Sequence, residues 1–230
     1  ANNETGAIQP IREIGALCRK RGVLFHTDAV QAAGHLTIDV QRDNIDMLSL
    51  SAHKFHGPKG IGLLFAKSNI QLTSLIRGGG QERGKRAGTE NLPGIIGLAA
   101  ALKDAQENMQ QNTAYITGLR DALRNGLDKI DGAGFNGSRE HCLPGTVNYS
   151  FQGVNGETLL SLLSNEGICC SSGSACSAGS LEPSHVLLAL GLSHETAQSA
   201  LRFSLCEYNT MDEVQTIITK VTEAVNRLRR

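Results

Sequence analysis

Apolar residues recur at two different spacings along the chain, and the change of spacing predicts where helices give way to strands. The first set repeats at helical intervals between Pro10 and Gly22, with the proline at the helix start and the glycine just past the end. Short apolar runs follow at 23–25, 46–50 and 61–66, and the first two have the character of buried strands. The third strand is expected to be antiparallel to its neighbour, because the connection between them is too short to cross over.

The second half of the chain predicts a smaller α+β domain. A helical pattern opens at Pro93 and runs to about Ile130, with one interruption allowed, and such a helix often bridges two domains. After a turn-rich connection at 131–137, residues 145–151 alternate like a strand with one buried face. The remaining predicted elements are a helix at 157–166, a helix at 182–190 ended by Gly191, a strand at 200–205 that holds Arg202, and a closing helix after a capping box at Thr210.

Lys54 follows the second apolar run directly, in the stretch Ser51-Ala52-His53-Lys54. Asp28 and Gln31 follow the first run, and the ligands of α/β sheets gather at the carboxyl ends of strands. Most lysines are solvated surface charges, because an amine must be desolvated or placed near cations to become nucleophilic near neutral pH. The setting of Lys54 instead favours Schiff-base chemistry with an aldehyde cofactor that carries a basic ring nitrogen.

Three neighbours of Lys54 each have a functional and a structural interpretation. An ionised Asp28 would keep a pyridine nitrogen protonated, so that the ring could accept electrons, whereas a helix cap or loop carboxylate is the plainer alternative. Gln31 could donate a hydrogen bond to a ring oxygen. His53 could bind a cofactor phosphate or carry a proton, although packed histidines are more common than catalytic ones.

The composition is that of an ordinary soluble globular protein. Of the 230 residues, 40% are apolar and 19% are charged, and the formal net charge is zero, so neither nucleic-acid binding nor disorder is expected. No apolar run approaches the roughly eighteen residues of a membrane span and the start has no signal pattern, so we expect a cytoplasmic protein without a membrane partner. Six cysteines without a Cys-x-x-Cys pair fit a reducing compartment and at least one working thiol.

The segment from Arg77 to Asn91 is rich in glycine and charge. Its arginines and backbone amides could hold an anion. A solvated surface loop is the alternative interpretation.

Several motifs together resemble the NifS/IscS-type cysteine desulfurases, and the match extends over essentially the whole chain. The motifs that carry the resemblance are Asn2-Asn3-Glu4-Thr5-Gly6, His26-x-Asp28-x-x-Gln31, Ser51-x-His53-Lys54, Gly57-Pro58-Lys59-Gly60, Gly78-Gly79-Gly80-Gln81-Glu82, Arg86-x-Gly88-Thr89, Ser172-Gly173-Ser174-Ala175-Cys176, Glu182-Pro183-Ser184-His185-Val186 and Arg202-Phe203-Ser204. Ordered motifs at such spacing are far more specific than any one of them.

The resemblance implies an α/β fold, part of a fold-type I pyridoxal-phosphate enzyme. Residues 1–112 would form the C-terminal part of the large, cofactor-binding domain, with a mostly parallel sheet. Residues 113–230 would form a smaller α+β domain with the loop of a persulfide-forming cysteine. Such enzymes have an N-terminal portion, with a cofactor-stacking histidine and a phosphate-binding turn, that we expect to be missing from this sequence.

The resemblance also implies roles for individual residues. Lys54 would hold pyridoxal phosphate covalently and Asp28 would pair with its ring nitrogen, while Gln31 and Asn3 would lie near its phenolic oxygen and Ser51 and His53 would bind its phosphate. Thr89 would reach the cofactor phosphate of the other subunit, which implies a homodimer. Asn3 and Arg202 would bind the substrate L-cysteine, because a guanidinium can clamp a carboxylate with two hydrogen bonds.

Cys176 matches the cysteine that takes the sulfur as a persulfide. That chemistry needs a thiolate on a mobile arm, and the small residues of 171–180 would supply one. Cys169 and Cys170 could form a polysulfide or a resolving disulfide with Cys176, but we expect both to be packing residues at a strand end. No metal site is expected, apart from Cys176 as a transient iron–sulfur ligand.

The implied activity is conversion of L-cysteine to L-alanine, with sulfur passed to an acceptor or iron–sulfur scaffold protein. Two alternatives stay open. One is a selenocysteine lyase or another fold-type I lyase. The other, kept open by the missing N-terminal portion, is a truncated and non-catalytic protein that relays sulfur or acts as a scaffold.

Overall fold

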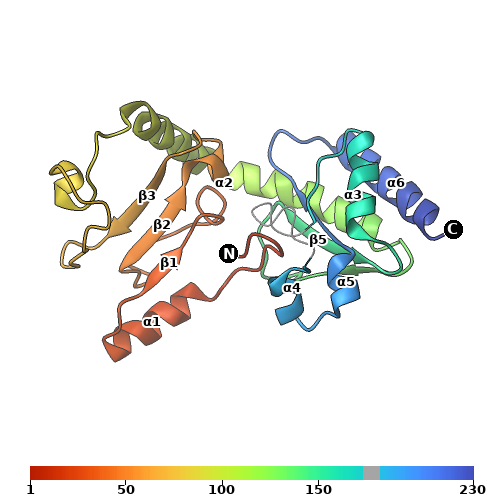
Figure 1. Cartoon of the computed structure of the whole chain (residues 1–230), viewed down its shortest axis with the longest axis horizontal. Coiled ribbons are helices and arrows are strands. Elements are labelled where there is room, and N and C mark those ends of the chain that lie inside the picture. Colours follow the sequence, from red (N-terminus) through yellow and green to blue (C-terminus); the bar gives the residue numbers. More distant parts are fainter. Residues whose placement is uncertain (173–181) are drawn as a thin grey trace. The chain divides into compact units, whose positions relative to one another are not determined.

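The computed structural model describes residues 1–172 and 182–230 of the chain, which is drawn in Figure 1. It divides into two compact units, one made of Pro10–Met109 and the other of Ala1–Gln9 together with Gln110–Arg230. None of the helices within the described ranges combines the length and the apolar character that crossing a membrane requires.

The Pro10–Met109 unit is built on a three-stranded sheet in the order β1-β2-β3. Its strands are β1 (His26–Asp28), β2 (Met47–Ser51) and β3 (Gly62–Ala66). β1 pairs with β2 in parallel, and β2 pairs with β3 in antiparallel orientation. The orientation predicted for β3 is therefore confirmed.

The first helix of this unit begins and ends where the local sequence signals predicted, and the long helix expected from Pro93 to about Ile130 ends earlier, at Leu127. Helix α1 (Ile11–Arg21) starts after Pro10 and ends at Gly22, whose left-handed φ of 65° suits a residue without Cβ. A short 3-10 helix, η1 (Ala52–Phe55), continues directly from β2, and a second, η2 (Gln81–Gly84), lies in the glycine-rich loop. The core packs alanines and aliphatic side chains of the 29–55 region against Leu98 of the long helix α2 (Leu92–Leu127).

The other unit contains a three-stranded antiparallel sheet in the order β4-β5-β6. Its elements are β4 (Ala133–Phe135), β5 (Thr146–Phe151), α3 (Gly156–Asn165), α4 (His185–Ala189), α5 (His194–Gln198), β6 (Ala200–Ser204) and α6 (Met211–Leu228). Thr210 and Glu213 form the capping box predicted at the start of α6.

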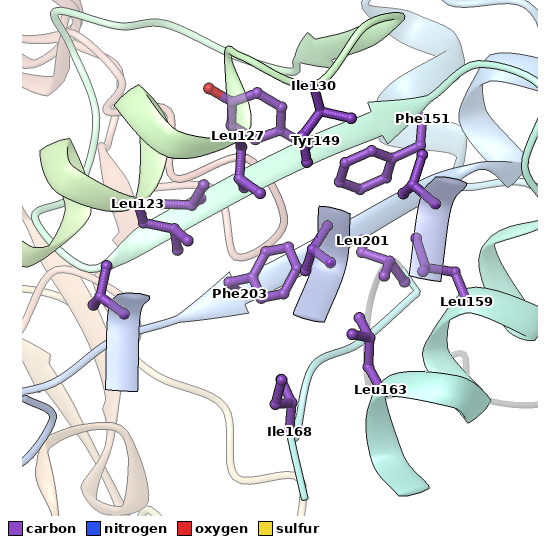
Figure 2. Packing of buried hydrophobic residues seen from close by; sticks show 14 of the residues in the cluster. Leu123, Leu127, Ile130, Tyr149, Phe151, Leu159, Leu163, Ile168, Leu201 and Phe203 are labelled. Atoms are coloured by element: carbon purple, nitrogen blue, oxygen red, sulfur yellow. The ribbon is translucent and has the colours of Figure 1, made fainter. Parts of the chain in front are cut away.

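The core of this unit lies between the sheet and the helices α2, α3 and α6. Figure 2 shows Tyr149 and Phe151 of β5 beside Leu201 and Phe203 of β6, with Leu163 of α3 directed into the same cluster. The hydroxyl of Tyr149 lies in this apolar core and donates a hydrogen bond to Asp128 Oδ1 at 2.7 Å. Burial, followed by that carboxylate, raises the pKa of Tyr149.

The first predicted strand was wrong in its position. Val23 and Leu24, expected to be buried, are 56% and 58% exposed, and the strand begins only at His26. The reason lies at Phe25, whose carbonyl accepts the backbone N–H groups of both Asp46 and Met47. These two hydrogen bonds join the residue before β1 to the beginning of β2, and regular strand pairing starts only after them.

Other predictions needed smaller corrections. Residues 145–151 were expected to have one buried face, but β5 is buried along its whole length. Helix α4 begins at His185 and not at 182, because Ser184 caps it. The sequence signals missed β4 and α5, both of which are short.

Replacing Leu163 by alanine should destabilise the Gln110–Arg230 region, because this fully buried side chain fills the centre of the core. We expect the free energy of unfolding to fall by about 2–5 kcal/mol. Leu190, which is 52% exposed in the same unit, provides the control. Its replacement by alanine should change stability by less than about 0.5 kcal/mol in the same urea titration, and equal losses in the two variants would contradict the packing described here.

Candidate functional site

The parallel pairing of β1 and β2 brings the first group of predicted site residues to one edge of the sheet. Asp28, the last residue of β1, lies opposite Ser49, and β2 ends two residues later at Ser51. The backbone N–H of Ala29 donates to the carbonyl of Ser49, so the pairing persists to the point where the chain turns away. Asp28 and the Ser51–Lys54 stretch therefore leave adjacent strand ends on the same side, as ligand-binding residues of α/β sheets do.

Asp28 has a carboxylate that can receive a ligand. One oxygen, Oδ1, accepts the backbone N–H of Val30 at 2.8 Å, which fixes the side chain at the strand end. Within residues 1–172 and 182–230, no hydrogen bond to the second oxygen is found, and the residue is exposed. This geometry leaves an oriented acceptor for a protonated ring nitrogen.

The Ser51–Lys54 stretch presents three polar side chains in little more than one turn. Ser51 Oγ lies 2.9 Å from His53 Nδ1, which orients the imidazole. His53 and Lys54 are both exposed, whereas Ala52 and Phe55 point into the core. The Lys54 amine has no hydrogen-bond or ion-pair partner in the described part of the chain, and because the residue is exposed, that part of the chain does not desolvate the amine.

The backbone around η1 leaves no room for larger residues. His56 has a left-handed φ of 63°, and the chain then doubles back at Gly57. A Cβ on Gly57 would lie 2.8 Å from Cβ of Ala52, which is closer than real Cβ atoms approach. The glycine predicted as part of a turn is thus required by the tight packing of the turn against η1.

These residues fit pyridoxal phosphate in the chemistry of their donor set. They combine an open amine, an oriented carboxylate and a Ser–His pair of the kind that binds phosphate. Gln31, three residues beyond Asp28, is half-buried. Thr89 is exposed and lies beyond η2 in the glycine-rich loop, so its assignment to a phosphate remains a prediction.

A second group of predicted residues lies in the other unit, around the turn at Asn2–Gly6. Asn2 Oδ1 accepts the backbone N–H groups of Glu4 and Thr5, both at 2.9 Å, and closes the turn. Arg202 on β6 donates from Nη1 to the carbonyl of Asn3 at 2.8 Å. The predicted substrate residues Asn3 and Arg202 are therefore in contact although they are 199 positions apart in sequence.

Glu4 is a buried residue to which the sequence analysis assigned no role. It is 3% exposed, and its Oε2 accepts a hydrogen bond of 2.6 Å from Ser184 Oγ. Its backbone carbonyl accepts from Asn148 Nδ2 at 3.1 Å. Glu4 and Ser184 both belong to motifs that carry the family resemblance, but no local sequence pattern predicts the hydrogen bond between them.

The predicted persulfide residue, Cys176, lies in the segment 173–181, outside the described residues. The two cysteines before it differ in environment. Cys169 is exposed, whereas Cys170 packs against the core of its unit. Burial, reinforced by Cys169, raises the pKa of Cys170 to about 11, so that its thiol stays protonated and weakly nucleophilic near neutral pH. Cys170 therefore packs in its unit, whereas Cys169, for which packing was also expected, is exposed.

Asp46 joins the strands at the end of the sheet opposite to the one from which Asp28 and Ser51 leave. Its Oδ2 accepts the backbone N–H of Phe25 just before β1, and its Oδ1 accepts from Lys67 Nζ just after β3, at 2.9 and 2.8 Å. One carboxylate thus joins the ends of two strands that flank β2. The hydrogen bond from Lys67, followed by that from Phe25, lowers the pKa of Asp46.

Comparison with protein families matches residues 1–217 to the aminotransferase class-V family, whose members depend on pyridoxal phosphate. A cysteine desulfurase IscS of Clostridium botulinum strain Hall is 50% identical over 232 aligned residues, which cover 100% of this chain and 58% of the relative. A cysteine desulfurase IscS of Methanosarcina thermophila is 48% identical over 229 residues, covering 100% and 57%. The chain thus spans less than two thirds of the length of these relatives.

Solved structures of NifS-like proteins are also similar to nearly the whole of this chain. A NifS-like protein superimposes with a TM-score of 0.90 at 40% identity, over 99% of this chain and 59% of that one. A NifS-like protein from Rickettsia africae also gives a TM-score of 0.90, at 33% identity, over 98% of this chain and 60% of that one. The expected α/β fold of a fold-type I fragment is confirmed.

Replacing Asp46 by asparagine tests whether this carboxylate holds the three strands together. Because the folded-state pKa lies below the unfolded value near ~3.9, Asp46 stabilises the fold above that pH, and the contribution is lost as the pH falls through the folded pKa. The variant should lose about 1 kcal/mol at pH 7 and should show a weaker loss of stability between about pH 5 and pH 3.

Urea unfolding at the two ends of that pH range checks the prediction. Asp104, exposed on α2 in the same unit, provides the matched control, since Asp104→Asn can still accept from Asn108. A pH profile of Asp46→Asn that matches the wild type would contradict the role of the carboxylate.

Proposed function

The chain belongs to the class-V aminotransferase family, and from that premise we propose that it acts as a pyridoxal-phosphate-dependent cysteine desulfurase. The observation that carries the proposal is the parallel pairing of β1 and β2, which puts the Asp28 carboxylate and the Lys54 amine at adjacent strand ends. Relatives named cysteine desulfurase IscS, about half identical over the whole chain, support the choice of reaction.

In this proposal the sheet edge of the Pro10–Met109 unit binds the cofactor. Pyridoxal phosphate supplies an electron sink for the substrate when it is bound. Lys54 attaches it covalently, Asp28 keeps its ring nitrogen protonated, and Ser51 with His53 binds its phosphate. Gln31 and Asn3 bond near the phenolic oxygen, and Thr89 contacts the phosphate held by a second copy of the chain. His53 is also the proposed proton carrier, because its exposed ring is already oriented by Ser51 Oγ.

The substrate is proposed to be L-cysteine, with its carboxylate held by Arg202 and Asn3. The Cys176 thiolate attacks the substrate sulfur, so that an S–S bond forms at Cys176 while the carbon–sulfur bond of the substrate breaks. The electron pair of the broken bond stays on the substrate carbon, which takes a proton and leaves as L-alanine. No external oxidant or reductant is consumed, because the sulfur is oxidised to a persulfide while the substrate carbon is reduced.

The persulfide must then pass to another molecule. We propose a sulfur-acceptor or iron–sulfur scaffold protein as the recipient, with Cys176 as a transient cluster ligand, in line with the resemblance to cysteine desulfurases. The working form is proposed to be a cytoplasmic homodimer without nucleic-acid or membrane partners. A selenocysteine lyase and a non-catalytic sulfur relay are the alternatives, and the experiments below separate them.

Replacing Lys54 by alanine should abolish covalent attachment of the cofactor. With the wild-type chain and added pyridoxal phosphate, we expect a visible absorption band and, after borohydride reduction, a phosphopyridoxyl mass at Lys54. The variant should lose both, whereas Lys59→Ala, an exposed lysine five positions on, should keep both. A wild-type chain that stays colourless with added cofactor would favour the non-catalytic alternative.

Replacing Cys176 by alanine should stop sulfur transfer and leave the cofactor spectrum intact. With L-cysteine and a thiol reductant, sulfide release should fall by about 10³-fold or more, because the attacking group is gone. Cys18→Ala on α1 is the control and should release sulfide at the wild-type rate. Sulfide release that survives Cys176→Ala would exclude the persulfide role, and a much higher rate with L-selenocysteine than with L-cysteine would favour the lyase.

A further inference from the structure

Two neighbouring side chains, one on β5 and one on β6, donate hydrogen bonds to consecutive carbonyl groups of the N-terminal turn. Arg202 Nη1 on β6 donates to the carbonyl of Asn3 at 2.8 Å. Asn148 Nδ2 on β5 donates to the carbonyl of Glu4 at 3.1 Å. Arg202 and Asn148 are direct partners in the antiparallel register, so their side chains leave the same face of the sheet. The turn that carries Asn3 is therefore attached to both strands at adjacent positions.

The turn is closed by its own hydrogen bonds, so it responds to these two contacts as one piece. The backbone N–H of Asn2 donates to the carbonyl of Ala7 at 2.9 Å and joins the two ends of the turn. Inside the turn, Asn2 Oδ1 accepts the backbone N–H of Glu4 at 2.9 Å. A displacement of the Glu4 carbonyl therefore also moves Asn3, and with it the oxygen to which the Arg202 guanidinium is bonded.

The amide of Asn148 is buried, with 0% of the residue exposed, and both ends of the amide are hydrogen-bonded. Its Oδ1 accepts a hydrogen bond from Asn136 Nδ2 at 2.8 Å, which directs its Nδ2 to the Glu4 carbonyl. Asn136 Nδ2 also donates to Ser150 Oγ at 2.8 Å. A buried polar group is costly unless it is hydrogen-bonded, so the amide is confined to this orientation. Asn136 thus determines the direction in which Asn148 donates.

We propose that Asn148 is a positioning residue for the substrate carboxylate, because it fixes the turn whose Asn3 carbonyl orients the Arg202 guanidinium. The inference rests on the proposed function, in which Arg202 and Asn3 bind L-cysteine, and adds a buried residue to which the sequence analysis assigned no role. A guanidinium forms two parallel hydrogen bonds with a carboxylate only when both groups share a plane. Loss of the Asn148 amide should therefore weaken recognition of a carboxylate and matter little for a ligand that lacks one.

The experiment compares Asn148→Ala, Asn148→Asp and Ser150→Ala with the wild type, each as the full chain loaded with pyridoxal phosphate. The two probes are L-alanine and ethylamine, which is L-alanine without its carboxylate. Asn148→Asp keeps an acceptor for Asn136 but loses the donor to Glu4. Ser150→Ala is the matched control, because Ser150 is 3% exposed, lies on the same face of β5 and bonds to Asn136. Within the described ranges, no hydrogen bond from its hydroxyl reaches the turn.

Calorimetric titration measures the Kd of each probe. We expect both Asn148 variants to raise the Kd of L-alanine about 10-fold and to change the Kd of ethylamine by less than about twofold. Ser150→Ala should leave both constants near the wild-type values. Hydrogen–deuterium exchange, measured without cofactor or ligand, should show faster exchange of the Glu4 and Gly6 backbone N–H groups in the Asn148 variants, since both groups are bonded inside the turn.

Two kinds of result would overturn the proposal, and they are distinguishable. If both probes weaken by the same factor in Asn148→Asp, or if Ser150→Ala weakens L-alanine equally, Asn148 only supports the sheet; this comparison holds even if Asn148→Ala fails to fold. A wild-type chain that binds L-alanine no more tightly than ethylamine would instead overturn the proposed substrate site, and the positioning role with it. Unchanged exchange at Glu4 and Gly6 would show, independently of any ligand, that Asn148 does not hold the turn.

Discussion

Strand β5 is buried on both faces, and this constraint determines how the first residues of the chain are placed. One face carries Val147, Tyr149 and Phe151 in the apolar core, and the other carries polar side chains that must be hydrogen-bonded away from water. Asn136 Nδ2 donates to Asn148 Oδ1 and to Ser150 Oγ, both at 2.8 Å. Asn148 in turn donates to the Glu4 carbonyl, so the N-terminal turn completes the hydrogen bonding of a buried strand and belongs with the C-terminal unit.

The turn can approach β5 closely because Gly6 faces Thr146. Gly6 has a φ of +73°, and a Cβ at this position would lie 2.9 Å from Cβ of Thr146. Only glycine therefore fits both the left-handed conformation and the contact. The glycine of the first motif is needed for packing, and the neighbouring Asn3 and Glu4 are brought to Arg202 and Ser184 as a consequence.

Elements with local signals could be predicted from the sequence, and contacts between distant residues could not. The proline and glycine around α1 and the Thr210 capping box act within a few residues, so both ends of α1 and the start of α6 were predicted accurately. The placement of β1 failed because it depends on the carbonyl of Phe25 being bonded to residues twenty-one and twenty-two positions later. Asp28 and Lys54 were expected just beyond the carboxyl ends of two strands, and β1 and β2 do pair in parallel and bring these ends together. The Glu4–Ser184 bond spans 180 positions, and no periodicity of the chain reports it.

The alternation of β6 links the core of the C-terminal unit to the residues proposed for substrate binding. Leu201 and Phe203 point into the core, as Figure 2 shows, while Arg202 between them pairs in register with Asn148 on the polar face. Any change that shifts β6 to fill a cavity in the core must therefore also shift Arg202, its bridge to Ser171 and its bond to Asn3. Asp28 and Lys54, the residues proposed to bind the cofactor, are supported by a separate core, formed by residues of the Pro10–Met109 unit. Substitutions in the core of the C-terminal unit should consequently affect the position of Arg202, and those in the other core should affect the positions of Asp28 and Lys54.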